Sequence, residues 1–441
     1  MFKSANKMSK INFGIFLAAI FLLIFVFIIL YKLFINQSVD SKPNTTDIYI
    51  VDNISVAQEK IIEKFNNTNG QKINVIPINL PFDIFNTNER KELLSRSLRS
   101  KNNRIDLLAI DYIWVNRFSK WAQPLEEYLS EVDTTIFLNY SLEACKHDNK
   151  LVCLPYYIDV GLLFYRKDLI RSFPDSENLE KRLKDSITWE ELFALKAKYP
   201  EITNPFYLFP ANHYEGLVCS LMEAVVSLNS SVFDTLNAFK TNQAHKGLTL
   251  LYNLIHTHKL TPVNVTDFQE KESYEYAFQN NALFFRGWPG NEREFKEKYP
   301  EIVANLGIAA LPHPQGGSAT SVFGGWNLMI SSASQHKKEA FEFLKFIFRK
   351  DNQMILYEEM GLLPANKLVY SDSLYVLKNP ELIFYKKLLD RGFHRPMIED
   401  YTKKSDIISF YVNQALDETL TVEEALLKAE EMIESNRVLI H

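Results

Sequence analysis

Cysteine is scarce in this chain of 441 residues, which contains three. So few cysteines in so long a chain make no disulfide framework. Cys145 and Cys153 flank a KHDNK turn and would meet across a hairpin, although only their geometry decides whether they bond. Cys219 is then left over, and we interpret it as a small buried hydrophobic side chain. The cysteines therefore exclude a small, disulfide-stapled domain.

A basic stretch is also missing. The 49 Lys and Arg residues are opposed by 54 Asp and Glu residues, which gives a formal net charge of -5, and the two signs are interspersed along the chain. Nucleic-acid binding would require a basic stripe or face. We therefore expect no nucleic-acid partner.

Catalytic and metal-binding motifs are absent too. No GxSxG, HExxH, P-loop or GxGxxG motif occurs. His245, His256 and His258 have no cysteine or carboxylate at zinc-ligand spacing, so we interpret them as surface or helix-packing residues. We interpret the glycine pairs at 316–317 and 324–325 as residues of loops or of places where two backbones approach closely, and not as a phosphate-binding loop. We predict no catalytic residue, no metal and no cofactor, in a chain that is not an enzyme.

The N-terminus contains the longest uncharged stretch. Lys3, Lys7 and Lys10 precede an apolar run from Ile11 to Tyr31, which as a helix would measure about 30 Å, enough to span a bilayer core. The run is longer than a signal-peptide core of roughly 7–15 residues, and neither a small-residue cleavage site nor a cysteine for a lipid follows it. A buried core helix is disfavoured because no polar face is present. We predict a transmembrane signal anchor over residues 1–35, a cytoplasmic N-terminus and a body outside the cell membrane.

A polar tether at 36–46 leads to a body in which strands and helices alternate. We expect strands at 48–51, 72–80 (interrupted at Pro77) and 105–110, and helices at 55–65, 88–100 and 113–121. This alternation predicts an open, largely parallel sheet covered by helices on both faces. Ligands of such sheets lie at the carboxyl ends of the strands, which places Asp52, Asn53 and Asp111 at the mouth of a cleft.

The stretch from Leu151 to Leu169 organises the rest of the chain. An apolar run breaks at Pro155, which cannot donate to a sheet, so we expect no continuous central strand through it. Tyr156, Tyr157 and Asp159 follow, and GLLFY then predicts a buried strand. A polar break between two buried segments is typical of a chain that crosses between two lobes past a ligand. A strand edge with surface tyrosines is the alternative.

The second half repeats the mixture of strands and helices. We expect a helix at 188–199 with a capping box of Thr188 and Glu191, and helical patterns to about residue 258. Strands should follow within 280–291, at 306–312 and at 322–332, and helices at 336–348 and 421–436. Aromatic residues recur at the breaks between buried strands, namely Tyr157, Trp288 and Trp326. Flat rings stack on sugars while carboxylates accept bonds from their hydroxyl groups; each ring could instead close a core.

Six segments together carry a resemblance to a known family. They are YYIDVGLLFYRKDLI, TWEELFALKAKY, NNALFFRGWPG, LGIAALPHPQGG, VFGGWNLMISSAS and AFEFLKFI. In this order, over nearly the whole body, the chain resembles the extracellular solute-binding proteins of ABC transporters (family 1), of the maltose, trehalose and oligosaccharide type. The resemblance implies a type II periplasmic-binding-protein fold, in which two α/β lobes joined by a hinge close around a sugar and dock on a membrane permease.

The resemblance also implies where the sugar binds. It assigns sugar contacts to Tyr157, Asp159, Trp288, Gly325, Trp326, Asp111 and Arg395. Asp52, which the strand pattern places at the cleft, completes the set of expected substrate-binding residues. The related pattern often has a further arginine and a proline after Arg395, where this chain has Met397 and Glu399, while Tyr401 is retained. That departure leaves open the role of Arg395 and the identity of the sugar.

The lobes follow from the order of the strands. We expect residues 47–155 and 307–350 in lobe one, and residues 156–306 and 351–441 in lobe two. The predicted function is to capture a sugar, which we expect to be an oligosaccharide, between the lobes and to deliver it to an ABC permease. The expected partners are the carbohydrate, the permease subunits and, through the N-terminal helix, the lipid membrane; we expect a monomer.

Three other functions are compatible with parts of the pattern. A binding module that feeds a sensor would have the same cleft and differ only in its partner. A tethered glycan hydrolase would need two carboxylates about 5–10 Å apart beside the sugar. An iron-binding relative would use Tyr156 and Tyr157 as ligands, but the tryptophans favour carbohydrate.

Overall fold

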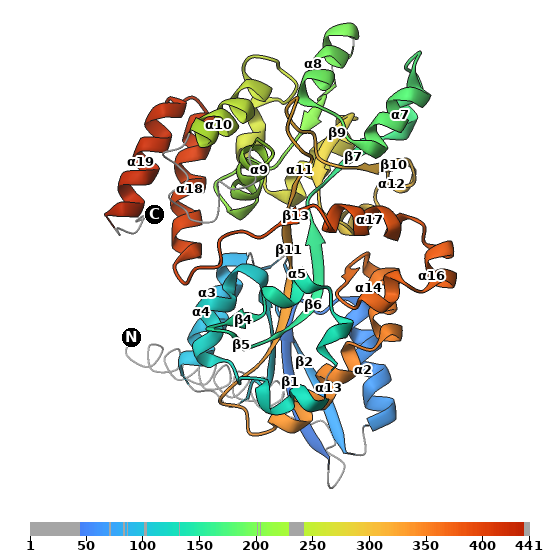
Figure 1. The fold of residues 1–441 in the computed structure, drawn as a ribbon, viewed down its shortest axis with the longest axis vertical. Coiled ribbons are helices and arrows are strands. Elements are labelled where there is room, and N and C mark those ends of the chain that lie inside the picture. Colours follow the sequence, from blue (N-terminus) through green and yellow to red (C-terminus); the bar gives the residue numbers. More distant parts are fainter. Residues whose placement is uncertain are drawn as a thin grey trace, which may run out of the picture.

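The computed structural model describes residues 45–69, 72–82, 84–85, 87–100, 104–131, 133–200, 202, 204–228 and 242–435. Within them the chain forms two α/β lobes, one above the other in Figure 1, each with its own sheet and its own hydrophobic core. The predicted two-lobed α/β fold is confirmed. The transmembrane helix predicted at residues 11–31 lies outside the described residues. None of the helices that are described is long and apolar enough to cross a membrane.

The first part of the chain builds most of the lower lobe. Its elements are β1 (Thr46–Asp52), α2 (Val56–Asn69), β2 (Ile73–Asn79), α3 (Thr87–Arg99), β3 (Leu107–Asp111), η1 (Tyr112–Trp114), α4 (Val115–Phe118), η2 (Ser119–Trp121), η3 (Glu126–Glu131), η4 (Thr134–Ile136), α5 (Asn139–Glu143), β4 (Lys146–His147), β5 (Lys150–Leu151) and β6 (Leu154–Val160). The helix α2 shows why the sequence folds this way, since its buried Ala57, Ile61, Ile62 and Phe65 recur at helical spacing.

The middle of the chain builds the upper lobe. Its elements are β7 (Leu162–Arg166), α6 (Lys167–Ile170), α7 (Ser176–Asp185), α8 (Trp189–Lys198), β8 (Tyr207–Leu208), α9 (Glu215–Val226), α10 (Asn242–Ile255), η6 (Val263–Asp267), α11 (Glu270–Gln279), β9 (Phe284–Gly287), η7 (Asn291–Phe295), α12 (Pro300–Ala304) and β10 (Leu306–Ala309). The capping box predicted for α8 is confirmed, with Thr188 and Glu191 bonded reciprocally.

The last part of the chain returns to the lower lobe and then to the upper one. It contains β11 (Ser321–Ile330), α13 (Lys337–Ile347), α14 (Lys350–Met360), β12 (Leu363–Pro364), α15 (Lys367–Tyr370), α16 (Ser373–Lys378), α17 (Glu381–Leu389), β13 (Gly392–Phe393), α18 (Tyr401–Leu416) and α19 (Val422–Glu434). The helices α18 and α19 pack against each other and against α9 and α10 of the upper lobe (Figure 1).

The larger sheet is mixed rather than largely parallel. Its order within the described residues is β12-β6-β11-β3-β1-β2, with β13 paired to β11. β1, β2 and β3 are parallel, as expected, but β11 is antiparallel to both β3 and β6. The physical reason is that β11 enters from the upper lobe, whereas β1, β3 and β6 end at the junction between the lobes.

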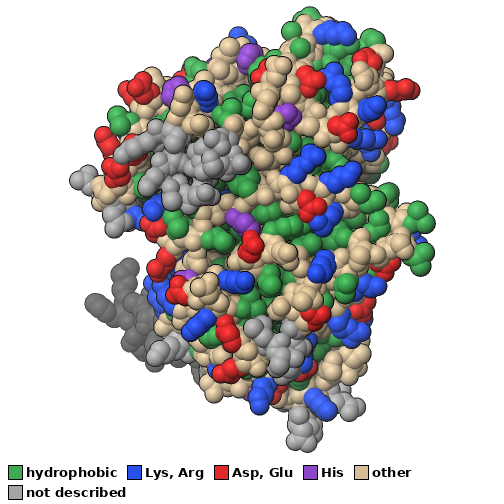
Figure 2. Space-filling view, in the orientation of Figure 1, with side chains coloured by type: hydrophobic (Ala, Val, Ile, Leu, Met, Phe, Trp, Pro, Cys, Tyr) green, Lys and Arg blue, Asp and Glu red, His purple; other side chains and the backbone are tan. Residues whose placement is uncertain are grey.

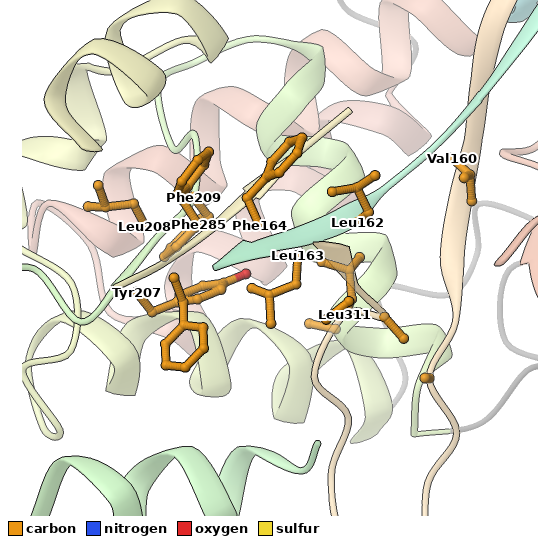
Figure 3. Close-up of a cluster of buried hydrophobic side chains, with 14 of the residues drawn as sticks. Val160, Leu162, Leu163, Phe164, Tyr207, Leu208, Phe209, Phe285 and Leu311 are labelled. Carbon is orange, nitrogen blue, oxygen red and sulfur yellow. The ribbon is translucent and has the colours of Figure 1, made fainter. Parts of the chain in front are cut away.

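The smaller sheet has the order β10-β7-β9-β8, and its outer strand β10 is antiparallel to β7. The side chains around it form an aromatic and aliphatic core that includes Phe164, Tyr207, Phe209 and Phe285 (Figure 3). This cluster is distinct from the one around β1, β3 and α13, but it continues across the junction to Ile158 and Val160 of β6 and Leu363 of β12, so buried apolar side chains also join the two lobes.

The prediction that no central strand runs through Pro155 is wrong. Pro155 is the second residue of β6 and faces Asn327 of β11, beside a shift of register at Trp326/Asn327. On the other side β12 pairs only with Tyr157 and Ile158. No strand bond on that side needs an N–H from Pro155, so the proline is tolerated. The chain changes lobes six residues later, at Gly161, between β6 and β7.

Two expectations from the composition can be followed in the structure. Cys145 and Cys153 flank the β4–β5 hairpin, and both are buried free thiols, as is Cys219. Figure 2 shows positive and negative side chains interspersed over the face in view. The three cysteines therefore form no covalent link between the lobes, and the face in view shows no band of one charge sign.

Candidate functional site

Four of the predicted residues come together on one face of the larger sheet. Trp326 of β11 lies opposite Asp111 of β3 on one side and opposite Tyr157 of β6 on the other. Side chains of directly opposed residues in a sheet point to the same face. Asp159 and Gly324 are the next opposed pair in the same alternation. Strand pairing therefore brings Asp111, Tyr157, Asp159 and Trp326 together.

Asp52, at the end of β1, belongs to a buried ion pair. One carboxylate oxygen accepts a hydrogen bond from the backbone N–H of Asn53 at 2.7 Å, and the other lies 3.4 Å from the Gln58 amide nitrogen. Nη2 of Arg90 lies 3.5 Å from Oδ1 of Asp52. Burial raises the pKa of Asp52 to about 6, against the opposing attraction of Arg90.

Arg90 was missed by the sequence reasoning. Its side chain is fully buried, and its guanidinium carbon lies 4.1 Å from the ring centre of Phe82 and 4.6 Å from that of Trp326. Two of its nitrogens, Nε and Nη1, have no hydrogen-bond partner. A cation stacked on aromatic rings with free donors is a group that can bind a polar ligand.

Asp159 is the most perturbed acid of the site. Burial, with a smaller contribution from the nearby Asp111, raises the pKa of Asp159 to about 7. Its Oδ1 is buried and accepts no hydrogen bond from the protein. Burial likewise raises the pKa of Asp111 to about 6, although its carboxylate accepts a bond from the Ile113 N–H at 3.1 Å. A buried acceptor without a donor is costly unless a ligand or water supplies one.

Trp288 reaches this face from the other lobe. It follows β9, and a Cβ placed on Gly324 would lie only 3.1 Å from Cζ3 of its ring. Its backbone N–H donates to the Tyr274 hydroxyl at 2.9 Å, and its indole nitrogen lies 3.5 Å from Oε1 of Glu270. The guanidinium carbon of Arg286 lies 4.0 Å from the centre of the indole ring. Trp288 is thus placed at the junction by polar contacts of the upper lobe.

Gly325 has a backbone reason for being glycine. Its φ of +115° is in a region that other residues rarely adopt, and a Cβ there would lie 2.5 Å from the carbonyl oxygen of Tyr157. The glycine lets β11 and β6 approach closely beside Trp326. Its part in ligand contact stays a prediction.

Arg395 is engaged within the protein. Its Nη1 donates to Oε1 of Glu215 at 2.6 Å and its Nη2 to the carbonyl oxygen of Phe323 at 3.2 Å. Tyr401, the residue retained in the family pattern, donates to the same oxygen of Glu215 at 2.7 Å. Only Nε of Arg395 has no partner. The ion pair therefore ties the segment after β13 to α9, and the positive charge of Arg395 opposes the rise in the pKa of Asp111 that burial causes.

In the described part of the chain, no group of three or more histidine, cysteine, aspartate or glutamate side chains could hold a metal ion. The site combines flat aromatic rings from both lobes with carboxyl groups whose pKa values are raised by burial and with the buried guanidinium of Arg90. Such a combination can stack on a ring and exchange hydrogen bonds with hydroxyl groups.

Fold and site define a class: a two-lobed α/β protein with its polar and aromatic residues gathered where the lobes meet. Residues 50–354 match the family model of the bacterial extracellular solute-binding proteins. The match covers more than half of the chain, and the chain belongs to this family.

Relatives and solved structures agree with this assignment. The chain is 25% identical over 292 residues to a probable ABC transporter-binding protein of Deinococcus radiodurans, covering 64% of this chain and 67% of that one. It is 23% identical over 396 residues to an arabinooligosaccharide-binding protein of Halalkalibacterium halodurans, covering 82% of each. Maltose-bound MalE3 of T. maritima superposes with a TM-score of 0.77 and 26% identity, over 89% of this chain and 100% of that one.

Proposed function

We propose that the chain is a membrane-anchored, extracytoplasmic binding protein that captures a sugar, most simply an oligosaccharide, between its lobes and delivers it to an ABC permease. One observation carries the proposal: strand pairing sets Trp326, Tyr157 and Asp159 on one face, and Trp288 of the other lobe lies against that face at Gly324. The maltose and arabinooligosaccharide named for the similar proteins support a carbohydrate ligand.

In this proposal each group has a separate task. Trp288 and Trp326 offer ring faces to the sugar, while Asp52, Asp111 and Asp159 accept bonds from its hydroxyl groups and Tyr157 lines the site. Arg90 joins this set as a donor, because two of its nitrogens have no partner. Gly325 allows the close approach of the backbone. Arg395 favours the ionised form of Asp111 through its charge.

The lobe limits form part of the proposal. The ranges expected from the sequence, 47–155 with 307–350 and 156–306 with 351–441, put the first crossing at Pro155. Strand pairing favours Gly161 instead, because β6 pairs with β11 up to Val160. For the same reason α14 and β12 fit lobe one, since β12 pairs with β6 and α14 packs on α2.

A thermal-shift screen tests the sugar assignment. The body from Asp47 onward is heated with a panel of monosaccharides and oligosaccharides, because a ligand of the folded state stabilises it by RT ln(1 + [L]/Kd). We expect at least one oligosaccharide to raise the melting temperature. A panel without any shift, repeated by calorimetric titration, would contradict the proposed ligand class.

Membrane anchoring is tested by fractionation. We expect the full chain in the membrane fraction and the chain without residues 1–46 in solution, folded and able to bind its ligand. A mature protein whose N-terminus lies beyond Tyr31 would contradict an uncleaved anchor.

The permease partner is tested by whether the sugar-loaded protein stimulates the ATPase activity of the reconstituted transporter.

A further inference from the structure

A second buried ion pair lies where the chain crosses between the lobes. Nε and Nη2 of Arg286 donate to the two carboxylate oxygens of Glu223 at 3.1 and 3.0 Å. The arginine side chain is 1% exposed and the glutamate side chain 7% exposed. The pair joins β9 to α9, and it forms a two-point contact that fixes the orientation of the guanidinium plane.

Glu223 also contacts both strands that cross between the lobes. Its Oε1 accepts the N–H of Val322 in β11 at 3.3 Å. A Cβ on Gly161 would lie 2.1 Å from the same oxygen, so the carboxylate occupies the space beside the first crossing. Gly161 in turn donates its N–H to the carbonyl oxygen of Val322 at 3.2 Å. One carboxylate therefore packs against the two crossing strands at the point where they are bonded to each other.

Arg286 connects this crossing to the proposed ligand platform. Its guanidinium carbon lies 4.0 Å from the ring centre of Trp288, two residues along the chain. A desolvated cation over an indole ring is attracted to it and restricts its orientation. The chain of contacts thus runs from the Trp288 ring through Arg286 and Glu223 to Gly161 and Val322.

We propose that Glu223 and Arg286 are positioning residues that couple the orientation of Trp288 to the geometry of the two strands crossing between the lobes. The proposal rests on the proposed sugar site, since Trp288 is taken as part of it. A sugar stacked on Trp288 then favours one arrangement of the crossing strands, because the ion pair touches both. Coupling of this kind is a difference in free energy between two lobe arrangements.

Removing the cation tests the coupling. Arg286→Met keeps much of the side-chain volume and leaves Glu223 without its partner. The matched control is Arg166→Met, because Arg166 lies on the neighbouring strand β7, is 5% exposed, and bonds both oxygens of Asp168 at 2.8 and 2.6 Å. Asp168 contacts neither Gly161 nor Val322 in these bonds and its side chain is 36% exposed, so the control removes an arginine–carboxylate pair at the end of β7 away from the crossing.

The lobe geometry is measured with two spin labels. Glu63→Cys on α2 and Lys181→Cys on α7 place one label on each lobe, and both positions are exposed. The three native cysteines are buried and should stay unlabelled. We expect Arg286→Met to broaden the distance distribution of the unliganded protein, to reduce the shift caused by sugar and to weaken sugar binding about tenfold. Arg166→Met should change none of the three.

The remaining outcomes distinguish a failure of the proposed coupling from a failure of the proposed sugar site. If Arg286→Met lowers only the unfolding free energy, with affinity and distances as in the wild type, the pair is merely structural and the coupling is overturned. If no sugar binds the wild type, the proposed function fails, while the unliganded distances still test the strand geometry. Should Arg286→Met not fold, Glu223→Gln is used, since it keeps the shape and an acceptor for Val322 but removes the charge.

Discussion

The two lobes each contribute a tryptophan that follows glycine, but they hold it differently. Trp326 of the lower lobe is 8% exposed and contacts the rings of Trp114 and Phe82 and the guanidinium of Arg90. Trp288 of the upper lobe is half-buried and is held by polar groups, the Tyr274 hydroxyl and Arg286 among them. The Gly-Trp pair therefore presents a ring packed against core aromatics in the lower lobe and a ring held by polar groups in the upper lobe, and in the proposed function both rings also face the sugar.

This difference separates folding from binding. A side chain that fills a core contributes to stability whether or not a ligand is present. A half-buried ring contributes less to the core and can contribute more to a ligand that covers its free face. We therefore expect the two tryptophans to have different effects when each is replaced.

The largest effect is expected for Trp326→Ala. The variant should lose about 3–5 kcal/mol of unfolding free energy, since a large buried ring is removed and Arg90 loses one of its two aromatic neighbours. Urea denaturation of the body from Asp47 onward measures the loss, with the dependence on denaturant checked for two-state behaviour. An unchanged unfolding free energy would show that Trp326 is not part of the core.

Trp288→Ala should have a smaller effect on stability and a clear effect on binding. We expect affinity for the best sugar to fall by about 1–3 kcal/mol, the range for an aromatic anchor, with a loss of stability well below that of Trp326→Ala. Calorimetric titration measures the affinity. Trp288→Phe is the matched control, because it keeps a stacking face and loses the contact to Glu270. Equal losses of unfolding free energy in Trp288→Ala and Trp326→Ala would contradict the proposed difference between the two tryptophans.

Local signals in the sequence predicted the fold well. The strand at 48–51, the buried GLLFY strand and the capping box of Thr188 and Glu191 were all confirmed. Each depends on residues a few positions apart, whose preferences a short window contains. Pro155 shows the limit of such rules, because its neighbours in the sheet, and not its own chemistry, decide that β6 continues through it.

The ion pairs of the site escaped the sequence reasoning because their partners are far apart in the chain. Glu223 and Arg286 are separated by 63 residues. A signal did exist, since each is a single charge in an apolar run, LVCSLMEAVV and ALFFRG, and a charge in a core needs a partner. Arg90 had no such signal, because it lies among several charged residues of α3. Its burial depends on Phe82 and Trp326, which only the folded structure brings to it.

The smallest effect is expected from a change of pH. It acts through the buried carboxyl groups of the site, and it should change both the stability of the fold and the affinity for sugar. In the folded, unliganded protein the pKa of Asp159 is raised to about 7 and those of Asp52 and Asp111 to about 6, chiefly by burial. The folded state therefore keeps protons that the unfolded chain releases at the usual pKa of 3.8. The contribution of these groups to stability is present at about pH 4 and is lost as pH rises through about 6 and 7.

Sugar binding should respond to pH in the opposite direction. Hydroxyl groups donate more strongly to an ionised carboxylate, so a bound sugar favours the ionised form of Asp159. We expect affinity to fall about three- to tenfold between about pH 8 and pH 6, on the scale of one proton taken up per site. Asp159→Asn should bind at least about 1.5 kcal/mol more weakly at the higher pH and should flatten the dependence. Sugar titrations of the wild type and Asp159→Asn across this pH range measure the affinity, and denaturation at the same pH values measures the stability. Together they test whether affinity and stability change with pH in opposite directions. Affinity and stability that fall together with pH would mean that Asp159 does not accept a bond from the ligand.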